Sequence, residues 1–218
     1  MSSDLLSPPA TQLNDAGAVG ERIVEATLRA LACYGLTKLT VDDVAREAGC
    51  SRATLYRYFP GKGALLAAVV ASETARLQRG LDEALADVGT FADAITAVGA
   101  YGARAFAGHE ALQSLLANEP GTVLPHLCFS GGDRLLEQLS GSIAPYLCRF
   151  MGPLQARRVG EWLARIILSY GCTPTRGAAA SVESRETQVV AVVREFVVPA
   201  VDQPAGPEVR GVPGSKGA

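Results

Sequence analysis

The sequence predicts an all-α protein of about nine helices and no β-sheet. Apolar residues recur along it at the three- and four-residue spacing of amphipathic helices, and no stretch alternates convincingly with the period of two that strands show. Residues that begin or end helices, such as Thr90 and Pro60-Gly61, separate these segments. With 218 residues, 48% of them hydrophobic, the chain is long enough to bury a substantial core.

Residues 20–66 hold the first three predicted helices, the first of which covers ERIVEATLRALACYGL. Thr40 can cap the second helix in a capping box with Asp43. Gly49 suits the tight turn after that helix, because a positive φ angle costs glycine little. One face of the second helix has helical spacing and is expected to be buried: Val41, Val44, Ala45 and Ala48.

The third predicted helix begins after the cap Ser51 and ends at Pro60-Gly61. Leu55 and Phe59 lie four residues apart and are expected to face the core, with Tyr56 at the edge. A helix that presents Arg, Thr and Tyr from a two-helix corner fits the major groove of DNA, although a helical hairpin with solvated charges would give the same pattern. The residues left to point outward are Arg52, Thr54, Arg57 and Tyr58.

Positive charge is concentrated at this corner. Between Cys50 and Gly63 there are three cations, Arg52, Arg57 and Lys62, and no acidic residue. Over residues 20–66 there are seven basic and five acidic residues, whereas the whole chain has a net charge of −2. A protein that coated DNA without selection would be basic throughout, so this distribution fits a compact DNA-reading unit on a near-neutral body.

Residues 67–198 continue the helical pattern without internal repeats and are expected to form a second domain. A helix is expected to end at Glu119-Pro120-Gly121. The predicted helices after the third are Gly63–Asp87, Phe91–Gly108, Ala111–Ala117, Pro125–Phe129, Gly132–Met151, Gln155–Tyr170 and Val182–Val198.

Both ends of the chain are expected to be disordered. Residues 1–19 contain no Lys or Arg and lack the basic and apolar regions of a signal peptide, and residues 199–218 are rich in Pro and Gly. The densest apolar run, Leu163–Leu168, is far too short to span a bilayer. The sequence therefore predicts a cytoplasmic protein that does not enter the membrane.

The side chains that most enzymes need are scarce. The chain has only His109 and His126 as histidines and contains no H-E-x-x-H, G-x-S-x-G, P-loop or dinucleotide-binding motif. Cys50, beside the third helix, could act as a redox switch, but we prefer a role as a small apolar residue in a turn. We therefore expect no catalysis, no metal and no cofactor. A reducing compartment is indicated by five cysteines without a C-x-x-C pair: Cys33, Cys50, Cys128, Cys148 and Cys172.

Residues 20–66 resemble the N-terminal domain of the TetR family of transcriptional regulators. The matching elements are ERIVEATLRALACYGL, TVDDVAREAG and CSRATLYRYFPGKGALL, and the most specific run is Thr54-Leu55-Tyr56-x-Tyr58-Phe59 with Lys62 three residues on. The resemblance implies three DNA-binding helices followed by six helices that form a regulatory and dimerisation domain. It also implies a ligand-responsive regulator, by default a repressor, that binds an inverted-repeat operator in double-stranded DNA as a homodimer.

The resemblance assigns phosphate contacts to four residues. Thr40 resembles the residue that meets a phosphate through its hydroxyl and backbone N–H, as a helix N-terminus favours anions. Tyr56 and Tyr58 resemble phosphate-contacting phenols, and Lys62 resembles the lysine that opens the fourth helix. Tyr56 could instead belong to the core, and Lys62 could be an unengaged surface lysine.

The resemblance places base recognition in the third helix. Ser51, Arg52 and Thr54 match the first-turn recognition positions. Arg57 occupies a position that varies in the family, and its bidentate fork suits a guanine.

The middle helices are expected to form the effector pocket, because ligand sites in helical bundles lie between helices. Their side chains are mostly apolar, which favours a small lipophilic effector. Arg165 could anchor an anionic group, but we prefer an ion pair with Glu119, Glu161 or Asp133, because an unpaired buried guanidinium is costly. His126 could likewise be a pocket residue or an interhelical histidine. The candidate pocket residues are Tyr101, Phe106, His126, Phe129 and Arg165.

The last two helices are expected to form the dimer interface, since they carry apolar stripes that need cover from two directions. Packing within one protomer is the alternative. A second function class also stays open, a helical carrier or adaptor that binds lipids or small molecules without sequence-specific DNA binding. The candidate interface residues are Trp162, Ile166, Val189, Val193, Phe196 and Val197.

Overall fold

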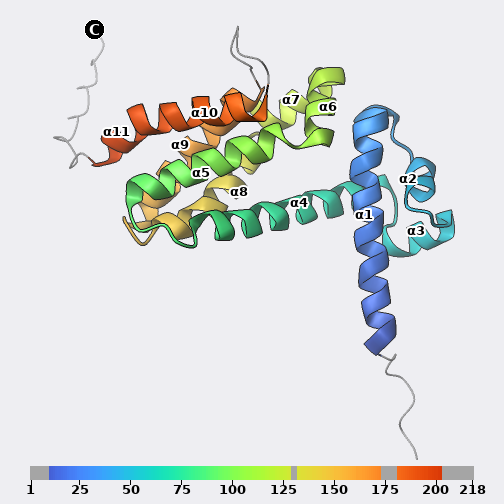
Figure 1. Ribbon diagram of the computed structural model, residues 1–218. Helices are drawn as coiled ribbons and strands as arrows, with labels where there is room; N and C mark the ends of the chain where they lie inside the picture. The colour runs from blue at the N-terminus through green and yellow to red at the C-terminus, as the bar shows by residue number, and fades with distance from the viewer. Residues whose placement is uncertain (1–9, 129–131, 173–180, 203–218) are drawn as a thin grey trace, which may run out of the picture.

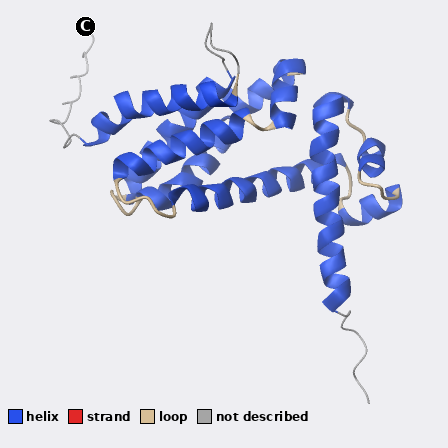
Figure 2. Cartoon of the chain, in the orientation of Figure 1, coloured by secondary structure: helices blue, strands red, loops and turns tan. Residues whose placement is uncertain are grey.

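The computed structural model describes residues 10–128, 132–172 and 181–202 and confirms the all-α prediction (Figure 2). Within these residues there is no strand. Because α10, the π-helical turn η1 and α11 run on continuously, the described residues form ten helices, where about nine were expected. The elements are α1 (Ala10–Lys38), α2 (Val41–Glu47), α3 (Arg52–Tyr58), α4 (Lys62–Leu85), α5 (Phe91–Ala107), α6 (Glu110–Asn118), α7 (Pro120–Cys128), α8 (Gly132–Leu147), α9 (Pro153–Cys172), α10 (Val182–Val192), η1 (Val193–Val197) and α11 (Val198–Asp202).

Figure 1 shows two groups of helices joined by α4. One group, which we call the head, consists of α1, α2, α3 and the start of α4. The other, the body, contains the remainder of α4 and α5 to α11. Each group has its own core, since Val44, Leu55 and Leu65 are buried in the head, whereas Ile95, Leu147 and Leu163 are buried in the body. None of the helices in the described ranges is long and apolar enough to cross a membrane.

Several helix ends differ from the predicted ones. α1 begins at Ala10, so residues 10–19 are helical rather than part of a disordered arm. The helix can extend this far because no proline interrupts the sequence between Ala10 and Tyr34. α7 begins at Pro120, where a helix was expected to have ended, because the first position of a helix needs no N–H donor and suits proline.

The C-terminal helix also runs further than predicted. Residues 199–202 continue it as part of α11 instead of belonging to the tail. The wider π-helical turn η1 lies immediately before this segment. Because the ring and missing N–H of Pro199 would strain a regular α-helix, a turn that departs from α geometry at this point accommodates it.

Three of the six residues predicted for a dimer interface instead lie in the core of a single chain. Val189, Val193 and Val197 are fully buried in the core of the body. Val189 and Val193 pack against Gly99 of α5, where an added Cβ would lie 3.1 Å from Val193. All three are therefore intramolecular core residues, and this part of the prediction is wrong. Trp162 and Phe196 remain exposed, and Ile166 is half-buried.

Candidate functional site

The corner between α2 and α3 has the geometry that the sequence predicts. Thr40 and Asp43 form a capping box at the start of α2, in which the Asp43 N–H donates to the Thr40 hydroxyl over 3.2 Å. Gly49 makes the turn with a φ of 63°, and the Ser51 hydroxyl accepts a hydrogen bond from the Thr54 N–H over 3.1 Å. Leu55 is 0% exposed, so α3 is fixed in the head by its inner face.

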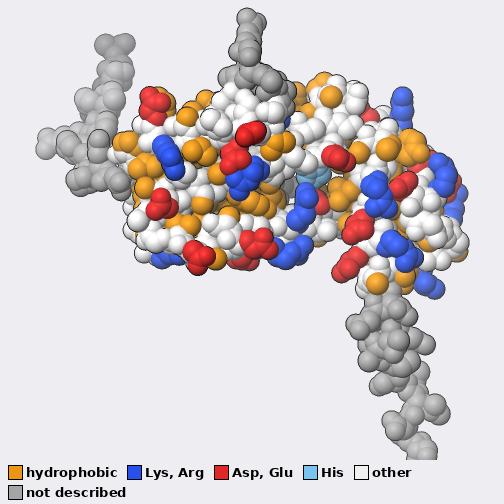
Figure 3. All heavy atoms as spheres, in the orientation of Figure 1, with side chains coloured by type: hydrophobic (Ala, Val, Ile, Leu, Met, Phe, Trp, Pro, Cys, Tyr) orange, Lys and Arg blue, Asp and Glu red, His pale blue; other side chains and the backbone are white. Residues whose placement is uncertain are grey.

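The outer face of α3 carries cationic and aromatic side chains. Arg52, Tyr56 and Arg57 are exposed, whereas Thr54 and Tyr58 are half-buried. Arg52 lies over the ring of Tyr56, with 5.5 Å between the guanidinium carbon and the ring centroid, and Arg57 lies similarly over Tyr58 at 5.2 Å. Figure 3 shows Lys and Arg side chains over this end of the molecule.

Helical periodicity placed Tyr56 at the edge of α3 and Tyr58 on its outer face, and the structure has these two positions reversed. Tyr56 is 42% exposed and therefore does not belong to the core, and it is Tyr58 that packs against the hydrophobic core of the head near Gly20. The cause is the position of α1, which covers one edge of α3. The hydroxyl of an edge tyrosine can still reach a neighbouring phosphate, because its ring and its polar tip lie in different surroundings.

Two predicted phosphate contacts are already engaged within the protein. The Thr40 N–H donates to the Asp43 carboxylate over 3.1 Å, and the Thr40 hydroxyl and Arg46 hold the pKa of Asp43 below its usual value. A phosphate at Thr40 would have to replace Asp43. The Lys62 ammonium donates to the Leu36 carbonyl over 2.6 Å, which leaves two of its three donors for another acceptor.

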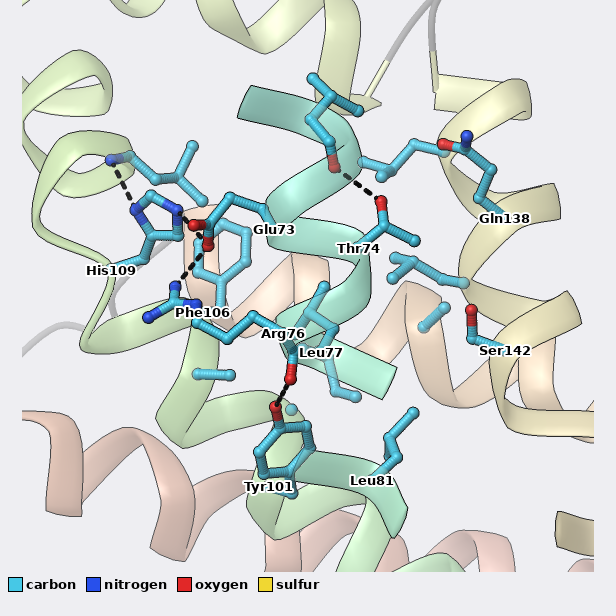
Figure 4. Close-up of a pocket in the computed structure, with 18 of the residues that line it drawn as sticks. Glu73, Thr74, Arg76, Leu77, Leu81, Tyr101, Phe106, His109, Gln138 and Ser142 are labelled. Atoms are coloured by element: carbon cyan, nitrogen blue, oxygen red, sulfur yellow. Dashed lines mark hydrogen bonds and ion pairs between the residues drawn. The ribbon is translucent and has the colours of Figure 1, made fainter. Parts of the chain in front are cut away.

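A cavity of about 370 Å³ lies where α4, α5, α6, α8 and α9 meet, and Leu28 and Leu31 of α1 complete its wall. Figure 4 shows the side chains that surround it. Val70 of α4 also lines the cavity and is 56% exposed, so the cavity reaches solvent beside α4. Its size is at the lower end of the range for small-molecule sites.

Two of the five predicted pocket residues, Tyr101 and Phe106, line this cavity. Arg165 does not, because it is exposed on α9 and donates to Glu161 over 2.8 Å, one of the ion pairs that the sequence suggested. Its assignment as a pocket residue is therefore wrong. Phe129 and the side chain of His126 lie outside the described part of the structure.

Most of the wall is apolar, but one end carries a polar group that the sequence analysis did not find. Glu73 of α4 pairs with Arg76, one turn on, and lies 3.2 Å from Nε2 of His109. Nδ1 of His109 accepts a hydrogen bond from the Leu112 N–H and so caps α6. Figure 4 shows the His109 ring with Nε2 facing Glu73. Because Nδ1 accepts a hydrogen bond, the neutral imidazole carries its proton on Nε2.

Tyr101 lies at another side of the cavity, beneath α4. Burial raises the pKa of its phenol, so the hydroxyl stays protonated at neutral pH. It points at the Arg76 carbonyl from 3.5 Å. Because this hydrogen bond is long, the Tyr101 hydroxyl can donate instead to a polar group of a ligand.

Comparison with known proteins agrees with this geometry. The family described as "Bacterial regulatory proteins, tetR family" matches residues 23–69. A protein of Mycobacterium tuberculosis (strain ATCC 25618 / H37Rv), named as an uncharacterized HTH-type transcriptional regulator, is 30% identical over 203 residues, which are 91% of each chain.

Solved structures show the same fold across both groups of helices. The TetR family repressor AlkX from Dietzia sp. strain DQ12-45-1b, implicated in biodegradation of n-alkanes, aligns with a TM-score of 0.59 and 19% identity over 83% of this chain and 95% of its own. The transcriptional regulator FadR from Bacillus subtilis, in complex with stearoyl-CoA, aligns with a TM-score of 0.56 and 15% identity over 80% of this chain and 97% of its own.

A helix-turn-helix head with an exposed basic recognition helix, carried on a helical body, defines a DNA-binding transcriptional regulator rather than an enzyme. The chain belongs to the TetR family of bacterial regulatory proteins.

Proposed function

We propose that this regulator represses transcription as a homodimer that binds an inverted-repeat operator and is released by a small lipophilic effector. The observation that carries the proposal is the position of the cavity. Its wall includes Leu28 and Leu31, which belong to the same helix as the core of the DNA-binding head. A molecule that fills the cavity must therefore press on α1 as well as on the body. Repression is further supported by the likeness to AlkX, which is described as a repressor.

Residues 20–66 act as the DNA-binding unit in this proposal, and residues 67–198 as the ligand-binding and dimerisation unit. α3 enters the major groove with Ser51, Arg52, Thr54 and Arg57 near the bases. The exposed Tyr56, the edge residue Tyr58 and the two helix-start residues Thr40 and Lys62 then lie towards the flanking phosphates. The exposure of Arg52 and Arg57 supports these roles, and each guanidinium lies over a tyrosine ring. Arg52 also donates to the Asp42 carboxylate over 3.2 Å and would exchange this partner for a base on binding.

Replacing Arg57 by alanine should relax base selection at one position of each half-site. A bidentate contact between arginine and guanine contributes about 1–3 kcal/mol of discrimination, and a lone phosphate contact contributes none. We expect Arg57→Ala to weaken binding to the cognate duplex much more than to a scrambled one. Fluorescence anisotropy with both duplexes measures this difference.

Two variants control this experiment. Arg57→Lys keeps the charge but loses the bidentate fork, so it should retain non-specific affinity without restoring base selection. Arg157→Ala removes an exposed arginine of α9 that pairs with Glu137 in the body, and it should leave both duplexes unaffected. Equal weakening of cognate and scrambled binding by Arg57→Ala would assign Arg57 to the phosphate backbone instead.

The lining of the cavity supports a lipophilic effector. Leu77, Leu81, Leu112, Leu139 and Ile167 are among the side chains around it, and polar groups are confined to a few positions such as Glu73 and Tyr101. The likenesses to AlkX, implicated in n-alkane biodegradation, and to FadR with stearoyl-CoA point the same way. Thermal denaturation with n-hexadecane, stearic acid and stearoyl-coenzyme A tests this class, since a ligand of the folded state raises the melting temperature.

Selection of genomic fragments by the purified protein tests the central claim. A regulator should enrich a few fragments that share an inverted repeat, at salt concentrations that suppress non-specific contacts. A helical lipid carrier, the alternative function, should enrich none and should still bind the lipophilic probes. Enrichment without a repeated half-site would contradict the dimeric mode of binding.

A further inference from the structure

Residues 36–40, which we call the α1–α2 connection, decide where the N-terminus of α2 sits. They comprise the short helical turn that follows a kink at Gly35 and ends at Lys38, and the two residues before α2. The backbone leaves helical geometry at Gly35, with a φ of 77°, and reaches the cap of α2 only at Thr40. Leu39 is buried in the core of the head, and Leu36 is half-buried against the same core. Polar contacts made by other elements add to this packing.

One of these contacts comes from the body. Glu119, at the junction of α6 and α7, accepts hydrogen bonds from the Thr37 N–H over 3.0 Å and from the Thr37 hydroxyl over 2.7 Å. Gly35 makes this approach possible, because a Cβ on that residue would lie 1.9 Å from Oε1 of Glu119. On the same segment, Lys62 donates to the Leu36 carbonyl over 2.6 Å.

The element that carries Glu119 touches both the head and the cavity. Ser114 of α6 donates to the Ala32 carbonyl of α1 over 2.7 Å, and Ala111 is buried in the core of the head. Leu112 and Leu115 of the same helix line the cavity. A displacement of α6 by a bound molecule would therefore change the position of Glu119.

Glu119 is suited to hold the connection as a charged acceptor. The hydrogen bond from the Thr37 hydroxyl, the Thr37 N–H and the neighbouring Lys38 and Lys62 ammonium groups keep its pKa below the usual value. The carboxylate is thus ionised at neutral pH, and hydrogen bonds to ionised acceptors are stronger than those between neutral groups.

We propose that Glu119 is a positioning residue for DNA binding: its carboxylate, held by Thr37, fixes the α1–α2 connection from the body and so sets the position of the N-terminus of α2 against the DNA backbone. The importance of that N-terminus rests on the proposed phosphate contact at Thr40. The bond lies outside α3 and adds no direct contact to DNA. A displacement of α6 would move the Glu119 carboxylate and, with it, the α1–α2 connection of the head. No movement within α3 is required.

The test compares Glu119→Ala with Glu137→Ala, which removes an exposed glutamate that pairs with Arg157 within the body. Without its acceptor, the connection should open more often, and hydrogen exchange of the amides of residues 36–40 should become about tenfold faster. Operator affinity should fall by about tenfold as well, because the N-terminus of α2 is no longer held in place. Glu137→Ala should change neither quantity by more than about twofold.

Two further variants separate this role from a general loss of stability. Glu119→Gln retains an acceptor for the Thr37 N–H and should recover most of the operator affinity. Thr37→Val removes only the hydroxyl, and combining it with Glu119→Ala should add almost nothing to the effect of Glu119→Ala alone, because both changes break the same contact. Full additivity, or unchanged exchange at residues 36–40 in Glu119→Ala, overturns the proposal. The exchange measurement needs no DNA, so it stays decisive even if the wild-type protein selects no operator.

Discussion

Replacing both Trp162 and Phe196 by glutamate is expected to convert the protein to monomers and to weaken operator binding by at least about a hundredfold. Both side chains are large, apolar and exposed, at 40% and 58%, on helices α9 and η1, whose inner faces are already buried in the body. Exposed aromatic residues that remain after a core has formed are typical anchors of protein interfaces. Two like charges brought together across a two-fold axis would oppose association.

The loss of affinity follows from the way a two-fold dimer reads DNA. Each recognition helix reaches only a few bases, and the second half-site binds at a high effective concentration once the first is occupied. Sedimentation gives the mass of the double variant, and anisotropy gives its affinity for the whole operator and for a single half-site. The half-site affinity should be unchanged, because neither residue lies in the head.

Ala71→Glu controls for the introduction of charge at an exposed apolar position. Ala71 lies on α4, outside the proposed interface and outside the wall of the cavity. This variant should stay dimeric and should bind the whole operator like the wild type. If the double variant of Trp162 and Phe196 also sediments as a dimer, the interface must involve other surfaces of the body.

The local structure of the head could be predicted because a few neighbouring residues decide it. The Thr40–Asp43 capping box, the turn at Gly49 and the Ser51 cap each depend on side chains within three residues of one another. The buried position of Leu55 follows from helical periodicity alone. Such features need no knowledge of what the helices pack against.

The roles of the C-terminal helices could not be settled in this way. An apolar stripe shows that a helix face is covered, but not whether the cover is the same chain or a partner. Val189 and Val193 turned out to face α5, where Gly99 lets them approach closely. Arg165 lies among apolar neighbours in the sequence, yet it shares the exposed face of α9 with Glu161, one turn before it.

The polar end of the cavity was beyond prediction for another reason. Glu73 comes from the middle of α4, and His109 from the residue before α6, so no local pattern links them. The contact between Thr37 and Glu119 spans 82 residues and depends on how α6 is placed against α1. Long-range polar contacts of this kind are determined by tertiary packing, which no local pattern of residues reveals.

Saturating operator DNA is expected to weaken binding of a lipophilic effector by roughly a hundredfold, the upper part of the range for allosteric coupling. The wall of the cavity joins α1, α4 and α6, and all three contact the core of the head. A ligand that favours a wider arrangement of these helices disfavours the spacing at which two heads fit successive major grooves, about 34 Å or a multiple of it apart. By thermodynamic linkage, the factor by which the ligand weakens DNA binding equals the factor by which DNA weakens ligand binding.

The measurement is a titration with whichever probe among n-hexadecane, stearic acid and stearoyl-coenzyme A stabilises the protein, with and without operator. Ala105→Trp should abolish the coupling by filling the cavity that Ala105 lines, and its operator affinity should become insensitive to the probe. Ala71→Trp, at an exposed position of α4 outside the lining, should behave like the wild type. Equal affinity for the probe in both wild-type titrations would show that this ligand does not drive release. If Ala105→Trp still responds to the probe, the cavity beside α4 is not the site through which the effector acts.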